Sequence, residues 1–110
     1  MMYMPDALTS MIALMAADKS RFVWPHAVGY NVNGFVLTPA QLAAAIKKHL
    51  PKFEIQYEPD FRQAIADSWP DSMDDSDARK EWDWAPTFSV SEMTADMLTK
   101  LQERHAKVGL

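Results

Sequence analysis

The residues best suited to binding a ligand lie between Asp60 and Pro86, where an arginine, a run of acids and three tryptophans occur together. Arg62 carries a planar guanidinium whose five N–H donors match a carboxylate or a phosphate. Trp69 supplies a flat apolar surface with one donor, and Pro70 directly after it prevents a helix from continuing. The pair indicates a site for a small anionic ligand, and we expect both side chains on one concave surface.

A purely structural role for the same two residues stays open on the sequence alone. Arg62 can pair with Asp60 or with Asp67, and Trp69 can be a core residue. Either role would leave the segment without a ligand.

Four acids in the same stretch invite a calcium site, because hard cations bind several carboxylates on one loop. The acids are Asp71, Asp74, Asp75 and Asp77. Their spacing fails the EF-hand pattern, because Met73 replaces an acid and no glycine follows. We therefore favour helix-start charge over calcium. The histidines at 26, 49 and 105 are too widely spaced for zinc, and no serine lies in a nucleophile motif.

An N-terminal helix is predicted from about Pro5 to Ala17, because apolar residues recur there at i, i+3, i+4 and i+7. The recurring residues are Leu8, Met11, Ile12 and Met15. The segment is rich in methionine, whose flexible side chain adapts to irregular surfaces. We expect Met1, Met2, Met4, Met11 and Met15 either to fill the core or to form a docking face.

Two further helices start with capping boxes. In this motif the side chain of a Ser or Thr accepts the backbone N–H of a Glu or Gln three residues later, whose side chain accepts the backbone N–H of the Ser or Thr. The pairs are Thr38 with Gln41 and Ser89 with Glu92. The first helix should run from Pro39 to Leu50, and the second should fray over residues 105–110. A shorter helix is expected from Ser76 to Trp82, with Trp82 and Trp84 as core anchors.

Period-two alternation predicts strands at Tyr30–Asn33 and Phe53–Tyr57. Phe22–Pro25 is predicted to be a short extended piece, which Pro25 restricts to a sheet edge or a loop. Strand, helix, strand in this order implies a parallel pair joined by a right-handed crossover. The predicted fold is therefore a small α+β single domain over residues 1–110, with the parallel strand pair and its crossover helix packed against N- and C-terminal helices.

Composition limits the classes of function. A chain of 110 residues can bury roughly 65% of its unfolded surface, which permits a modest core. With 11 Lys and Arg against 15 Asp and Glu, and no basic stripe, a nucleic-acid partner is not expected. The sequence has no cysteine, no basic region before the first apolar run and no apolar stretch of about 20 residues. We expect a cytoplasmic chain without a membrane partner.

Taken together, several blocks resemble the C-terminal region of the short-chain-dehydrogenase type of L-threonine 3-dehydrogenase and, more broadly, the extended short-chain dehydrogenases and NAD-dependent epimerase/dehydratases. The blocks are MMYMPDA at the start, YNVNG from Tyr30, LTPAQLAAAIKKHLP from Leu37, RQAIADSWP from Arg62, DDSDAR from Asp74, WDWAP from Trp82 and FSVSEMTADMLTKL from Phe88. The resemblance covers nearly the whole chain but only the last third of such an enzyme. It implies a substrate-side lobe in which Arg62 orients the carboxylate of threonine and Trp69 walls the pocket.

The resembled enzymes use NAD and a Tyr-x-x-x-Lys pair, and this chain has neither signature. Its three glycines, at 29, 34 and 109, cannot form GxGxxG. The residues four places after Tyr3, Tyr30 and Tyr57 are not lysines. We therefore predict no catalytic residue and no NAD binding by this chain alone, and we expect it not to oxidise threonine.

Two functions remain open from the sequence. The first is the substrate-side lobe of an NAD-dependent L-threonine dehydrogenase, present as a shortened product, a subcloned piece or a stand-alone gene, with a dinucleotide-binding domain as a possible partner. The second is a small self-associating interaction module. In both cases apolar side chains near the N-terminus would lack cover, so we expect a homo-oligomer through the Met-rich N-terminal helix.

Overall fold

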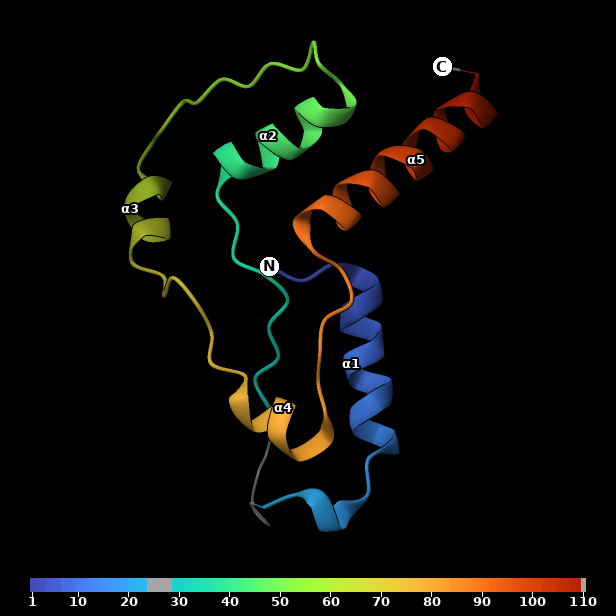
Figure 1. Cartoon of the computed structure of the whole chain (residues 1–110). Helices are drawn as coiled ribbons and strands as arrows, with labels where there is room; N and C mark the ends of the chain where they lie inside the picture. The colour runs from blue at the N-terminus through green and yellow to red at the C-terminus, as the bar shows by residue number, and fades with distance from the viewer. Residues whose placement is uncertain (24–28, 110) are drawn as a thin grey trace. The chain divides into compact units, whose positions relative to one another are not determined.

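The computed structural model describes residues 1–23 and 29–109, and over these ranges the chain is helical (Figure 1). Its elements are α1 (Met4–Ala16), the 3-10 helix η1 (Lys19–Arg21), α2 (Pro39–His49), α3 (Arg62–Asp67), α4 (Ser76–Trp82) and α5 (Val90–Val108). They form two compact units. Unit 1 comprises Met1–Val36 and Pro70–Phe88, and unit 2 comprises Leu37–Trp69 and Ser89–Leu110.

The predicted α+β fold is wrong, because the described residues contain no strand and hence no parallel pair. Tyr30–Asn33 belongs to unit 1 and Phe53–Tyr57 to unit 2. Both segments lack regular secondary structure, since an alternating pattern produces a strand only where a second backbone offers a ladder of hydrogen bonds. Trp24 and Pro25 of the expected edge piece, and His26, lie outside the described residues.

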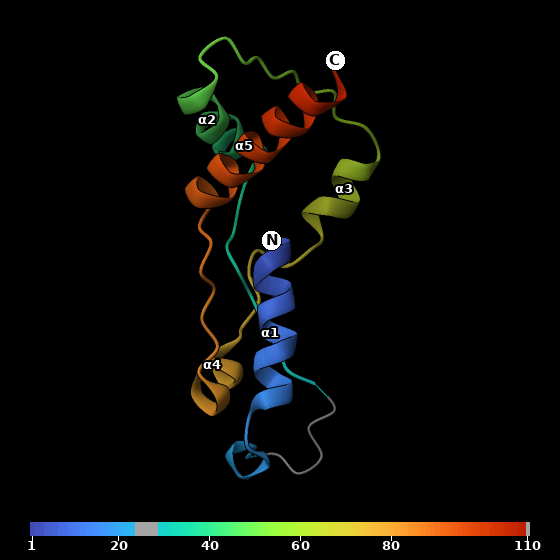
Figure 2. The ribbon, with the colours of Figure 1, turned by 90° about the vertical axis from the view of Figure 1, so that its right-hand side faces the viewer.

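The core of unit 1 is a cluster around Ala78, Trp82 and Trp84, all of which are buried. This confirms the predicted role of the two tryptophans. Residues from α1 and from the segment after position 29 pack onto the cluster, and in Figures 1 and 2 α4 lies beside the C-terminal half of α1. The packed side chains are Met2, Ala13, Leu14, Ala17, Phe22, Tyr30 and Val32.

The α1 helix forms as predicted, but it packs through its other face. Asp6 and Ser10 are buried, whereas Met4, Met11 and Met15 are 66%, 62% and 85% exposed. The expectation that these methionines fill the core is therefore wrong for all three. Ala13, Leu14 and Ala17 pack onto the tryptophan cluster, whereas Leu8, Met11, Ile12 and Met15 remain exposed.

Asp6 joins the first turn of α1 to the segment that precedes α5. Its carboxylate accepts hydrogen bonds from the backbone N–H of Thr87 at 3.0 Å, the Thr87 hydroxyl at 2.5 Å and the N–H of Phe88 at 2.9 Å. Burial acts to raise the pKa of Asp6, but these hydrogen bonds outweigh it and hold the pKa below its usual value. The carboxylate is only 1% exposed, so it is a structural anchor and not a ligand group.

Gly34 allows the chain start to pair with Phe35. The N-terminal ammonium donates to the Phe35 carbonyl at 2.7 Å, and the Phe35 N–H donates back to the Met1 carbonyl at 2.9 Å. A Cβ at position 34 would lie 2.7 Å from the Met1 oxygen and 3.0 Å from the Met2 Cα. Both are backbone atoms, so the clash cannot be relieved by a side-chain rotation.

Gly34→Ala is therefore expected to lower the free energy of unfolding by about 1–3 kcal/mol, the usual cost of an overpacked site. Gly29→Ala is the matched control, because a Cβ there meets nothing within 4 Å and the substitution only restricts the unfolded chain. Urea denaturation measures both. Equal stability of the two variants would show that the contact between Met1 and residue 34 is not maintained in solution.

Unit 2 is built on α2 and α5, which lie side by side (Figures 1 and 2). Both predicted capping boxes are present, with Thr38 and Ser89 accepting the backbone N–H of Gln41 and Glu92. The prediction that residues 105–110 fray is wrong for residues 105–109. The helix α5 continues to Val108 and is closed by Gly109 in the left-handed conformation, at φ 70°.

None of the helices in the described ranges has both the length and the apolar character that a bilayer span requires.

Candidate functional site

The candidate anion-binding residue Arg62 opens α3 and pairs with Asp60. Its Nε lies 3.0 Å from both Asp60 oxygens, and a terminal nitrogen lies 2.6 Å from Asp60 Oδ2. The Arg62 backbone N–H also donates to Asp60 Oδ1 at 2.9 Å. The hydrogen bond from the Arg62 side chain is the main cause of a lowered Asp60 pKa, and the same bond raises the pKa of Arg62. One carboxylate is therefore already held in the two-pronged geometry that guanidinium favours.

The Arg62 side chain remains accessible despite this pair. It is 76% exposed, and the Asp60 side chain is 42% exposed. A pair so open to water is screened and exchanges readily with other anions. Arg62 can thus accept a ligand carboxylate without any buried group having to be uncovered.

Trp69 is not a core residue, since it is 69% exposed. It follows the end of α3, where its N–H donates to the Ala66 carbonyl at 3.1 Å and continues the helical turn. Phe61 and Ile65 precede it at spacings of four residues and are 78% and 51% exposed. The segment from Phe61 to Trp69 presents an arginine and three large apolar side chains to solvent. Whether Arg62 and Trp69 share one concave surface stays a prediction.

An open groove in unit 2 lies elsewhere, between the end of α2 and the C-terminal half of α5. Its volume is about 370 Å³, and it is lined by Leu50, Leu98, Leu101, Gln102, His105 and Ala106. Neither Arg62 nor Trp69 lines it. The sequence offered no indication of this groove, because residues 105–110 were expected to fray.

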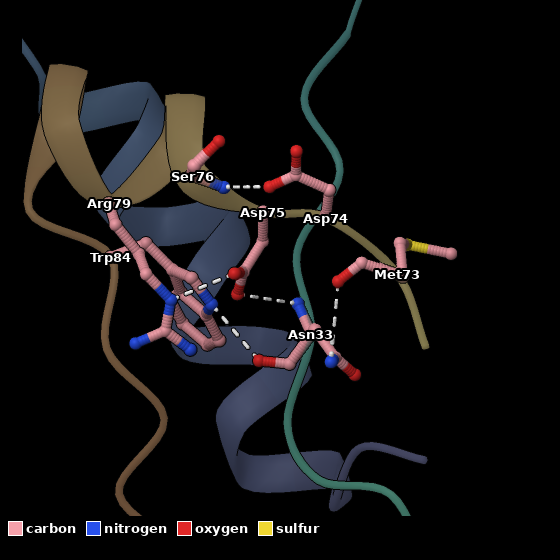
Figure 3. A network of polar contacts seen from close by, with 7 residues as sticks. All are labelled: Asn33, Met73, Asp74, Asp75, Ser76, Arg79 and Trp84. Carbon is pink, nitrogen blue, oxygen red and sulfur yellow. Dashed lines mark hydrogen bonds and ion pairs between the residues drawn. The ribbon is translucent and has the colours of Figure 1, made fainter. Parts of the chain in front are cut away.

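The acidic cluster serves the start of α4, as the sequence analysis favoured. Asp74 Oδ1 accepts the Ser76 N–H at 3.0 Å, and Asp75 Oδ1 accepts Arg79 Nε at 2.8 Å (Figure 3). The hydrogen bond from Arg79 is the main cause of a lowered Asp75 pKa. Among the described residues, no group of three or more His, Asp or Glu side chains is placed to hold a metal ion.

Asn33 links the extended segment after position 29 to α4 and the tryptophan cluster (Figure 3). Its N–H donates to Asp75 Oδ2 at 3.2 Å, its side-chain amide donates to the Met73 carbonyl at 3.5 Å, and its carbonyl accepts Trp84 Nε1 at 3.1 Å. These bonds satisfy a backbone that has no sheet partner. The network explains why Asp75 is buried while its neighbours in the acidic run are exposed.

Tyr30 is unsuited to acid/base chemistry at neutral pH. Its hydroxyl donates to Glu81, and this hydrogen bond, followed by desolvation and the charges of Glu81 and Asp77, raises the pKa of Tyr30 to about 12. A tyrosine that exchanges protons with a substrate needs a cation nearby to lower its pKa. Tyr30 has a carboxylate partner instead and stays protonated.

The glycines of the chain do not fit a dinucleotide cradle. Gly34 is filled by the backbone of Met1, and Gly109 closes α5. A pyrophosphate cradle needs clustered glycines at the start of a helix, where free N–H groups meet the phosphate. In this chain the capping boxes of Thr38 and Ser89 already occupy backbone N–H groups at the first turns of α2 and α5. Within residues 1–23 and 29–109, no glycines cluster at a helix start to make such a cradle.

No family model matches the chain. It is 46% identical over 105 residues to an uncharacterized epimerase/dehydratase of Staphylococcus haemolyticus, which covers 94% of this chain and 32% of that protein. It is 43% identical over 110 residues to the mitochondrial L-threonine 3-dehydrogenase of Sus scrofa, which covers 99% of this chain and 28% of that protein.

Solved structures show the same fold with similar coverage. The L-threonine dehydrogenase of Cupriavidus necator in its holo form matches at 51% identity with a TM-score of 0.84, over 92% of this chain and 32% of that one. The enzyme of Clostridium difficile matches at 44% identity with a TM-score of 0.87, over 94% of this chain and 32% of that one. The chain thus spans about a third of the length of the proteins it matches.

Proposed function

We propose that this chain supplies the substrate-side lobe of an NAD-dependent L-threonine dehydrogenase. It is homologous to L-threonine 3-dehydrogenases and epimerase/dehydratases over about a third of their length. The observation that carries the proposal is the guanidinium of Arg62, which is exposed on α3 and already holds a carboxylate in two-pronged geometry. L-Threonine presents a carboxylate of the same kind.

The Asp60 carboxylate occupies the position on Arg62 that the substrate carboxylate would take. The carboxylate of free threonine would compete with the exposed Asp60 carboxylate for Arg62. Replacing one carboxylate by the other costs little free energy, because both are in contact with water. Arg62 would therefore fix one end of the substrate. A fixed carboxylate sets the distance from that end to the hydroxyl carbon where oxidation occurs.

Trp69 would form the apolar wall beside this anchor. Its exposed indole offers a rigid face against which the short methyl-bearing side chain of threonine can pack. The wall also excludes water from one side of the substrate. Both roles are binding and orientation.

The chemistry itself would come from another part of the enzyme. The glycines of this chain are too far apart in sequence for an NAD cradle, and the pKa of Tyr30 is raised and not lowered. A dinucleotide-binding domain would supply NAD, the hydride acceptor, together with the proton-transfer pair. The lobe proposed here presents threonine to that domain.

The test replaces the matched third of the Cupriavidus necator enzyme by this chain. The hybrid is expected to reduce NAD in the presence of L-threonine, with kcat/KM within about tenfold of the parent, because the substrate contacts are retained. NADH absorbance is the readout. This chain alone, titrated with NAD by calorimetry, is the matched control and is expected to give no saturable heat. A well-folded hybrid that binds NAD but does not turn over threonine would contradict the proposal.

A further inference from the structure

One face of α1 is apolar and uncovered. The face comprises Met4, Leu8, Met11, Ile12 and Met15, which are between 55% and 85% exposed. Four of them, at positions 4, 8, 11 and 15, follow the alternating spacing of four, three and four residues that defines the contact seam of a coiled coil. The partner best suited to such a seam is another helix.

The α1 face carries no charge. Asp6 is the only charged residue of α1, and it is buried on the opposite side by Thr87 and Phe88. A seam without charge can meet a copy of itself without repulsion across the contact. The net charge of −4 on each chain opposes association only weakly, because physiological salt screens charges beyond about 8 Å.

The spacing is also symmetric about the middle of the helix. When two copies of α1 run antiparallel about a two-fold axis between positions 9 and 10, Met4 lies opposite Met15 of the second copy. In the same register Leu8 lies opposite Met11 of the second copy. The same surface then serves both partners, as closed two-fold symmetry requires.

The area of the face suits a small dimer. Taking a fully exposed large side chain as on the order of 200 Å², the exposed fractions of the five residues correspond to roughly 650 Å² per copy, against about 800 Å² per partner in a standard interface. It lies just above the range of about 300–600 Å² for the largest apolar patch on a typical monomer.

We infer that this chain forms an antiparallel two-fold dimer in which the α1 faces of two copies pack against each other. The occupant is a second copy of the chain. This contact involves only α1 and is independent of the role of Arg62.

The first experiment is sedimentation equilibrium over a dilution series at micromolar concentrations. The wild-type chain is expected to be dimeric, and Met11→Glu and Leu8→Lys are each expected to raise the dissociation constant by at least 100-fold. Leu101→Glu is the matched control, since Leu101 is 55% exposed on α5. Helix content by circular dichroism should be equal in all four proteins. A monomeric wild type, or dissociation by Leu101→Glu and not by Met11→Glu, would overturn the inference.

The second experiment mixes the two monomeric variants. In the antiparallel register the lysine introduced by Leu8→Lys lies opposite the glutamate introduced by Met11→Glu, while the other pair keeps its native residues. The mixture is therefore expected to form a heterodimer, detected by sedimentation or by native mass spectrometry. A mixture that stays monomeric would rule out the register, because a parallel pairing places both introduced charges against apolar side chains.

Discussion

Arg62→Ala in the hybrid with the Cupriavidus necator enzyme is expected to raise KM for L-threonine about 100-fold, with a smaller fall in kcat. Removing the guanidinium leaves the substrate carboxylate without its two parallel N–H donors. Since the carboxylate does not react, this binding is common to ground state and transition state and appears mainly in KM. Steady-state NADH production over a range of threonine concentrations measures the effect.

Two further variants separate recognition from general damage. Arg62→Lys keeps the charge but loses the planar fork, so an intermediate KM is expected. Arg104→Ala removes an exposed arginine from α5 and should leave KM and kcat unchanged. The dissociation constant for NAD should be the same in all variants. If Arg62→Ala behaves like Arg104→Ala, Arg62 does not contact the substrate and only holds Asp60.

Asp6→Ala is expected to lower the free energy of unfolding by about 3 kcal/mol, because it leaves the part-buried donors of Thr87 and Phe88 without their acceptor. Asp6→Asn keeps one acceptor oxygen and should cost less. Asp71→Asn, at an exposed position in the acidic run, is the control and should be neutral. Urea denaturation at neutral pH gives the three values. A neutral Asp6→Ala would mean that the Asp6 anchor is not formed.

Asp6 should also make the chain sensitive to acid. Its pKa is lowered in the folded state, so the unfolded state takes up its proton first, near the ordinary value of about 3.9. The stabilisation is therefore fully present above that value and is lost as the pH falls through the lower folded pKa. Unfolding free energies measured between neutral pH and about pH 3 should fall less steeply for Asp6→Asn than for the wild type. A slope remains in the variant, because the pKa of Asp75 is lowered too.

Helix positions were predictable because their signals are local. The capping boxes at Thr38 and Ser89 and the apolar period of α1 each depend on residues within one or two turns. No sequence pattern indicated α3, a helix of six residues whose side chains are all exposed. An apolar period is visible in a sequence only where a core selects one face of the helix.

The absence of the two predicted strands could not be foreseen, because the alternation of apolar and polar residues in these segments is real. Tyr30 and Val32 both point towards the tryptophan cluster of unit 1, which produces a period of two without a sheet. The backbone of Asn33 is satisfied instead by Asp75 and Trp84, and that of Phe35 by Met1. These partners are more than 25 residues away in sequence, and no local pattern identifies them.

The candidate site was only partly predictable. The chemistry of Arg62 suggested an anion, and its pairing with Asp60 was one of the alternatives left open. Exposure of Trp69 was not predictable, since an indole followed by a proline occurs both in cores and on surfaces. The burial of Asp6 was not indicated by any sequence pattern either. A lone acid in the first turn of a helix is normally a solvated dipole partner.

The inverted packing of α1 also determines where oxidants act. The thioethers of Met4, Met11 and Met15 are open to peroxide, whereas Met93 is 5% exposed in the core of unit 2. Oxidation to the sulfoxide turns a flexible apolar side chain into a polar one, and cellular reductases reverse it. Mild oxidant would thus turn the exposed face of α1 from apolar to polar. It would also reach the exposed Met1, Met73 and Met97 and leave the buried Met93 unchanged. The methionines of α1 make its surface chemistry reversible without any cysteine in the chain.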